Sequence, residues 1–95
     1  MYVLVQHYIS DPHTFWSDVS ASLSVLPPNL SLHHCFPTSD GSHAVCVWQA
    51  DALRDVRSFI VAYVGLVSRN VYFPIENAEG IAAPSDIGGR PSMED

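Results

Sequence analysis

The chain is organised around one stretch, Leu30 to Ala50, in which two strand-like runs flank a tight turn. Strands are predicted over about residues 30–36 and 43–49, joined by Ser39-Asp40-Gly41-Ser42, a composition typical of a hairpin turn. The stretch also holds both cysteines and three of the five histidines. The stretch is therefore predicted to form an antiparallel strand pair. It also contains most of the side chains that could take part in metal binding or catalysis.

The turn predicts the register of this hairpin. If it is centred on Asp40-Gly41, Cys35 lies opposite Cys46, His33 opposite Trp48 and Phe36 opposite Val45. Because side chains alternate along a strand, one face is predicted to be core under helices: Leu30, Leu32, His34, Phe36, Val45 and Val47. The other mixes polar, sulfur and aromatic groups, and is predicted to line a pocket: Ser31, His33, Cys35, Ala44, Cys46 and Trp48.

Two helical patterns and two further strands surround the hairpin. The run from Tyr2 to Ile9 is predicted as a strand that is apolar on both faces. Ser10-Asp11-Pro12 then starts a helix that ends before Pro27. Its apolar face recurs at helical spacing: Phe15, Val19, Leu23 and Leu26. The second helix begins at Ala50 or Asp51, ends at Gly65, and buries Leu53, Val56, Phe59, Ile60, Tyr63 and Val64. The last strand is predicted over residues 70–75, and its Pro74 places it at a sheet edge.

This order of elements, βαββαβ, predicts an α+β, ferredoxin-like domain. We expect a four-stranded antiparallel sheet of order 4-1-3-2 with both helices on one face. The domain is predicted to cover residues 1–80, and the Gly- and Pro-rich residues 81–95 to form a flexible tail.

The composition of the chain limits the classes of partner that it is expected to bind. Hydrophobic residues make up 47% of the chain and charged residues only 15%, which favours a homodimer, although an apolar ligand pocket would also use such residues. Ten acidic residues and four arginines, with no lysine, leave a net charge of −6, the wrong sign for nucleic acid or an anionic membrane surface. The apolar runs are too short to cross a membrane. With no signal-like start, a cytoplasmic location with reduced thiols is expected.

The chain resembles the dimeric α+β barrel superfamily over about residues 1–80, and within it small single-domain proteins of mostly unassigned function. The residues that carry the likeness are Val5-Gln6-His7, Ile9-Ser10-Asp11-Pro12, Phe15-Trp16, Leu32-His33, Asp40-Gly41, Ala44 to Ala50, Val56-Arg57 and Asn70 to Phe73. The resemblance implies that two sheets pack face to face across a dimer axis, with a pocket between each sheet and its own helices. It also implies functions such as cofactor-free monooxygenase, polyketide cyclase or lactone isomerase, and one similar branch is linked to nickel.

Two kinds of site are predicted from the reactive residues. Imidazole and thiolate suit nickel, zinc or copper, so His7, His33, His34 and Cys46 are candidate metal ligands, although no pair has a known metal-motif spacing. Alternatively, His7 or His33 serves as a catalytic base beside a ligand-binding wall of Trp48, Tyr72 and Tyr8. A simpler interpretation makes the cysteines small buried hydrophobes and the aromatic residues ordinary packing.

The leading interpretation is a dimeric protein that binds a small apolar or aromatic molecule, or a metal ion. The first alternative is a cofactor-free monooxygenase, cyclase or isomerase that uses a single histidine. The second is a non-catalytic interaction scaffold. Whether the protein is an enzyme stays open at this point, and so does the choice between a site and a buried dimer seam for the His/Cys cluster.

Overall fold

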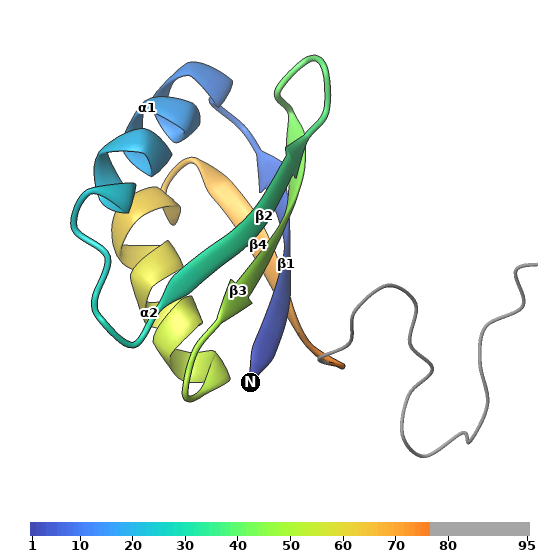
Figure 1. The fold of residues 1–95 in the computed structure, drawn as a ribbon. Helices are drawn as coiled ribbons and strands as arrows, with labels where there is room; N and C mark the ends of the chain where they lie inside the picture. Colours follow the sequence, from blue (N-terminus) through green and yellow to red (C-terminus); the bar gives the residue numbers. More distant parts are fainter. Residues whose placement is uncertain (77–95) are drawn as a thin grey trace, which may run out of the picture.

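The computed structural model describes residues 1–76, and Figure 1 shows one antiparallel sheet with both helices packed on the same face. The elements are β1 (Tyr2–Ile9), α1 (Pro12–Leu23), β2 (Ser31–Pro37), β3 (His43–Gln49), α2 (Leu53–Val64) and β4 (Ser68–Ile75). Their order in the sheet is β2-β3-β1-β4, and every neighbouring pair is antiparallel. The predicted ferredoxin-like fold and strand order are confirmed. The predicted boundary at residue 80 and the tail over 81–95 lie outside the described residues.

Local sequence accounts for both ends of α1. The Asp11 carboxylate accepts hydrogen bonds from the backbone N–H of Thr14 at 3.2 Å and from its hydroxyl at 2.8 Å, and Pro12 follows at the first helical position. The helix ends at Leu23, three residues before the predicted Leu26, because Ser24 already closes the last turn through its N–H. Leu26 nevertheless packs against the core, as its position in the apolar pattern predicted.

The second helix and the last strand follow the predicted pattern closely. The apolar face of α2 buries Val56, Phe59, Ile60 and Val64, whereas Tyr63 lies at its rim and is 39% exposed. Strand β4 begins at Ser68, two residues earlier than predicted, and lies at an edge of the sheet. This edge position is the one that Pro74 indicated, since proline cannot donate to a second neighbouring strand.

The hairpin turn is held by Asp40 and Gly41. The Asp40 Oδ1 atom accepts from the backbone N–H of Ser42 at 3.0 Å and from the Thr38 hydroxyl at 2.8 Å. Gly41 has φ of +76°, a left-handed conformation that glycine adopts without strain. The carbonyl of Gly41 accepts a bond from Trp16 Nε1 at 3.3 Å, so the turn is tied to α1.

The register of the hairpin is confirmed near the turn and wrong beyond it. Cys35 pairs with Cys46, and Phe36 with Val45, as predicted. The pairing then skips one residue, because Leu32 rather than His33 lies opposite Trp48. His33 is therefore the extra residue of a β-bulge, which shifts the pairing of everything before it in β2.

The helices cover the face of the hairpin that was predicted to line a pocket, and not the face that was predicted to be core. Ala44, Cys46 and Trp48 of β3 are buried and share that face with Val3, Val5 and His7 of β1. The predicted core face is wrong for four residues, which instead lie on the open face away from the helices: His34, Phe36, Val45 and Val47. The bulge leaves Leu32 facing the helices, and Leu30 is buried as predicted.

The hydrophobic core lies between the sheet and the helices. Its buried apolar members are Val3, Val5, Ile9, Phe15, Leu30, Ala44, Cys46, Trp48, Ala50, Val56, Phe59, Ile60 and Val64. Cys46, a small residue of β3, borders a space above the sheet. Neither helix in residues 1–76 has the length and apolar character that a membrane span requires.

Candidate functional site

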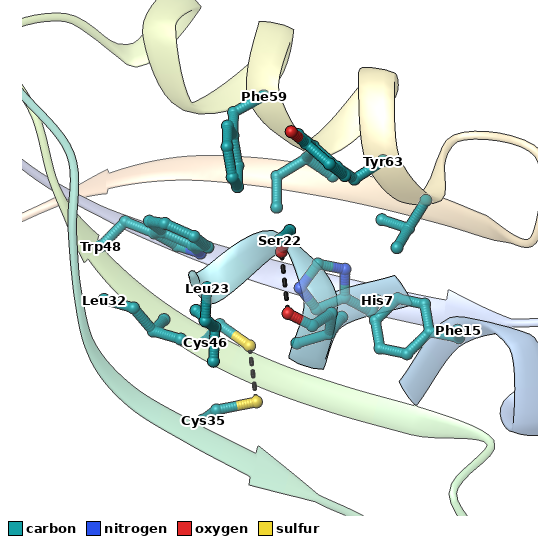
Figure 2. Close-up of a pocket in the computed structure, with 13 residues that line it drawn as sticks. His7, Phe15, Ser22, Leu23, Leu32, Cys35, Cys46, Trp48, Phe59 and Tyr63 are labelled. Atoms are coloured by element: carbon teal, nitrogen blue, oxygen red, sulfur yellow. Dashed lines mark hydrogen bonds between the residues drawn. The ribbon is translucent and has the colours of Figure 1, made fainter. Parts of the chain in front are cut away.

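A cavity lies between the sheet and the two helices, as Figure 2 shows. The space open to the centre of a water molecule is about 20 Å³. This is enough for about one ordered water. Its walls are almost entirely apolar and come from every element except β4: His7, Phe15, Val19, Ser22, Leu23, Leu32, Cys35, Cys46, Trp48, Phe59, Ile60, Tyr63 and Val64. Among the residues that line it there is no carboxylate and no guanidinium.

His7 is the titratable imidazole of this cavity. The residue is only 3% exposed, and its ring meets the Phe15 ring edge-on, with centroids 5.2 Å apart. Burial lowers the pKa of His7, an effect that the hydrogen bond to Asn70 partly opposes. The imidazole is therefore held neutral at pH 7, in the form that can accept a proton.

Asn70 orients that imidazole. The register of β1 and β4 places Asn70 directly beside His7, and His7 Nδ1 lies 2.6 Å from Asn70 Oδ1. An amide oxygen can only accept, so Nδ1 carries the proton and Nε2 keeps its lone pair. The side-chain N–H of Asn70 donates to the Ser68 backbone carbonyl at 3.4 Å, which favours this orientation of the amide. Nε2 is thus the nitrogen left to meet a molecule in the cavity.

Trp48 brings a hydrogen-bond donor that has no acceptor. The residue is 4% exposed, and its indole Nε1 is buried without a partner among the described residues. Figure 2 shows the indole ring extending from β3 toward the middle of the cavity, below Phe59. A buried donor left unsatisfied costs about 1–3 kcal/mol, so an acceptor placed beside it would be stabilised by a comparable amount.

The two thiols form another part of the wall. Cys46 Sγ donates to Cys35 Sγ at 2.9 Å, and this bond is drawn in Figure 2. Cys46 is buried, whereas Cys35 is half-buried on the edge strand β2. The bond lowers the pKa of Cys35, which accepts, and raises the pKa of Cys46, which donates.

Three partly exposed side chains stand among the residues that line the cavity. Leu23 at the end of α1 is 42% exposed and Tyr63 of α2 is 39% exposed, although both also line the cavity. Leu32 of β2 is half-buried and also lines the cavity. Rotation of these side chains would enlarge the cavity without moving the sheet, because exposed side chains change rotamer within nanoseconds.

The structure brings together only part of the predicted site. His7, Cys46 and Trp48 line the cavity. His33 does not, because the bulge turns it toward the open face. There its Nε2 lies 2.9 Å from Gln49 Oε1, and its ring is tilted against the Tyr2 ring with centroids 5.4 Å apart. His34 is also exposed on that face and stacks on Phe36, with ring centroids 5.6 Å apart.

The two predicted tyrosines also lie away from the cavity. The ring of Tyr8 is on the open face under the Arg69 guanidinium, 4.4 Å from it. Tyr72 lies on the helix-facing side of β4, and the Arg57 guanidinium is 5.3 Å from the centre of its ring. Burial raises the pKa of Tyr72, and its hydroxyl has no partner among the described residues.

The predicted metal ligands are divided between the two faces of the sheet. His7 and Cys46 lie on the helix-facing side, and His33 and His34 on the open side. Within residues 1–76 there is no group of three or more His, Cys, Asp or Glu side chains that could hold a metal ion.

Sequence reasoning missed Asn70, Phe15 and Tyr63 as members of the site. Asn70 could have been found by pairing β1 with β4, since an antiparallel register places one partner beside His7. Phe15 and Tyr63 were assigned to helix faces, but their place at the cavity depends on how the helices lie over the sheet.

The fold and the cavity together define a ferredoxin-like α+β protein with an apolar site under its helices. Comparison of the chain with protein-family models, with curated proteins and with solved structures gives no match. The features of the cavity that bear on function are its apolar walls and the indole N–H of Trp48, which is unpartnered within residues 1–76.

Proposed function

We propose that the protein binds a small, mainly apolar molecule carrying one hydrogen-bond acceptor in the cavity between its helices and sheet. The observation that carries this proposal is the buried, unpartnered Nε1 of Trp48 in a cavity with apolar walls. A pocket of this kind gains affinity from apolar contact and specificity from one or two placed polar groups. A carbonyl or phenolic oxygen is the complement of the indole N–H.

The size of the cavity sets a condition on the ligand. With room for about one water when closed, the site accepts a ring compound only if Leu23, Tyr63 and Leu32 move outward. All three are partly exposed and line the cavity. Compact monocyclic molecules are therefore favoured over extended polycyclic ones.

A matched pair of ligands tests this proposal. Acetophenone and isopropylbenzene have the same size and similar shape, but only acetophenone carries an acceptor oxygen. In calorimetric titrations, Trp48→Phe should lower the ratio of acetophenone affinity to isopropylbenzene affinity about tenfold, the value of one buried hydrogen bond. Trp16→Phe is the control, because Trp16 Nε1 already bonds Gly41 and does not line the cavity. If wild-type protein binds neither compound, or if Trp48→Phe leaves the ratio unchanged, the proposal is wrong.

A second candidate function is catalysis by His7. The specific observation in its favour is the 2.6 Å bond from Nδ1 to Asn70, which leaves Nε2 as a base. In the reaction, Nε2 would take a proton from an acidic O–H or C–H of the bound molecule, and the electron pair would stay on the substrate as a phenolate or enolate. Such proton removal is common to cofactor-free monooxygenases, cyclases and isomerases.

Exchange of an acidic C–H proton tests the base directly. Acetophenone carries such protons beside its carbonyl, and their replacement by deuterium in D₂O can be followed by NMR. Removal of a general base typically costs about 10²–10⁴-fold in rate, so His7→Gln should abolish any acceleration. His13→Gln is the control, because His13 is exposed on α1 and does not line the cavity. Equal exchange in wild-type and His7→Gln protein excludes this role.

We also propose that the open face of the sheet forms a homodimer. Antiparallel sheets that face water usually carry polar residues there, but this face carries exposed Phe36 and Phe73 around half-buried Leu4, Val45 and Val47. None of the residues that the four strands place on it is acidic, so the net charge of −6 is kept away from the contact. A second copy of this chain is the occupant that such a face fits.

Sedimentation tests the dimer. Wild-type protein should sediment at twice 10.4 kDa, and Val47→Glu should make it monomeric by placing a charge in the contact. Val61→Glu is the matched control, because Val61 is 58% exposed on α2, away from the sheet. Wild-type protein that stays monomeric at micromolar concentration contradicts this part of the proposal.

A further inference from the structure

The two cysteines are placed as a pair that can be joined without moving the backbone. Cys35 and Cys46 lie directly opposite each other in neighbouring antiparallel strands. Such partners have Cα atoms about 4.5–5.5 Å apart, within the 4.4–6.8 Å that disulfides require. Their Sγ atoms are already in contact at 2.9 Å on the same side of the sheet.

The environment of the pair gives the two sulfurs different roles. Cys35 lies on β2, an edge strand, and is half-buried, so a small oxidant can reach it. Cys46 is 5% exposed and donates its S–H to Cys35. That donation lowers the pKa of Cys35, and the thiolate is the form of cysteine that reacts. Cys35 is therefore the attacking sulfur, and Cys46 the one that resolves the product.

We propose that Cys35 and Cys46 are a redox modification site, in which a hydroperoxide oxidises Cys35 and Cys46 then closes a disulfide. In the first step the Cys35 thiolate attacks one peroxide oxygen, the O–O bond breaks, and a sulfenic acid and hydroxide form. In the second step the Cys46 sulfur attacks the sulfenic sulfur, an S–S bond forms, and water leaves with the Cys46 proton. In total, two thiols lose two electrons and hydrogen peroxide becomes two waters.

The reaction has a structural consequence at the cavity. Both sulfurs line it, so the disulfide removes the S–H donor and draws the sulfurs to about 2.05 Å. The bond also ties the edge strand β2 to β3 beside Leu32, another residue that lines the cavity. This proposal rests on the geometry of the thiols and does not depend on the proposed ligand.

The test uses the full chain, purified with a reductant that is then removed. One equivalent of hydrogen peroxide should lower the intact mass by two hydrogen atoms, and peptide mapping should find Cys35 joined to Cys46 within one chain. Dithiothreitol should restore both thiols. Two free thiols after peroxide treatment, counted in denaturant, would overturn the proposal, as would a disulfide found only between chains.

Two conservative variants test the assigned roles. In Cys46→Ser, Cys35 should form a sulfenic acid that dimedone traps and that persists because no second thiol resolves it. In Cys35→Ser, the buried Cys46 should react with peroxide at least about tenfold more slowly. Circular dichroism checks whether each variant is folded, and the wild-type mass measurement tests the proposal even if one variant is not. Equal peroxide reactivity of the two variants contradicts the assignment of Cys35 as the attacking sulfur.

Discussion

The buried imidazole of His7 makes stability depend on pH in a defined window. The pKa of His7 in the folded protein lies below its ordinary value of 6.5, chiefly because of burial. Between the folded pKa and 6.5, the unfolded chain binds the proton and the folded protein does not. The contribution of His7 is therefore complete above pH 6.5 and is lost as the pH falls through this window toward the folded pKa.

The size of the effect follows from the binding of a single proton. One group can change the free energy of unfolding by at most about 1.4 kcal/mol per pH unit. For a domain of this length, about 1 kcal/mol corresponds to roughly 4–8 °C in melting temperature. No carboxylate lines the cavity to stabilise an imidazolium, so we expect the free energy of unfolding to fall as the pH drops below 6.5, with a slope that stays under this limit.

The assay is urea unfolding at fixed protein concentration from pH 7.5 to pH 5, for wild-type protein and for His7→Leu. This range stays above the region in which Asp11 and Asp40 titrate, since hydrogen bonds from neighbouring groups lower both carboxyl pKa values and bring that of Asp40 to about 2. Wild-type stability should fall toward pH 5, and His7→Leu should remove most of that fall. His13→Gln should keep it, because His13 is exposed on α1. The reasoning is refuted if His7→Leu and wild-type protein show the same slope, or if wild-type stability rises as the pH falls.

Three further predictions follow from the cavity wall and the open face. Trp48→Phe should change stability by less than about 1–2 kcal/mol in thermal unfolding, because the lost packing is offset by removal of the unsatisfied donor, whereas Trp48→Ala should cost about 3–5 kcal/mol. A loss for Trp48→Phe well above about 2 kcal/mol would contradict this offset. The Cys35–Cys46 disulfide should add about 2–3 kcal/mol, since it closes a loop between residues 11 apart, and a lower urea midpoint for the oxidised protein would argue against it. Val47→Glu should lower the melting temperature more at high than at low protein concentration, because only the dimeric form loses a contact; a shift that is independent of concentration would place Val47 outside an interface.

Much of the fold could be predicted from the sequence because several local signals agree. Asp11-Pro12 starts α1, Asp40-Gly41 closes the hairpin, and Pro74 marks an edge strand. Each signal acts within a few residues, where sterics and backbone hydrogen bonds decide the outcome. The strand order followed from the resulting βαββαβ sequence.

The faces of the hairpin could not be predicted, for two physical reasons. Both faces carry apolar residues, so hydrophobicity alone could not show which one the helices cover. In addition, the bulge at His33 interrupts the alternation of side chains, and no turn signal announces it. Together these errors placed His33 in the pocket and Val45 and Val47 in the core.

Only part of the candidate site could be predicted from the sequence. The Cys35–Cys46 pair and the membership of His7 and Trp48 came from the sequence. The partner of His7, Asn70, and the unpartnered state of the indole N–H did not, because they arise from packing between distant segments. Such contacts are properties of the assembled core and leave no local pattern.

The most direct test of the central claim is the NMR signal of the two indole N–H groups during titration with acetophenone. Trp16 Nε1 already donates to Gly41, whereas Trp48 Nε1 is buried without an acceptor, so the two signals respond differently and can be assigned with Trp48→Phe. We predict that acetophenone shifts the Trp48 signal downfield, as hydrogen-bond formation does, and leaves the Trp16 signal in place, while isopropylbenzene produces no downfield shift. A Trp48 signal that acetophenone leaves unmoved, or that moves equally with isopropylbenzene, would contradict the account.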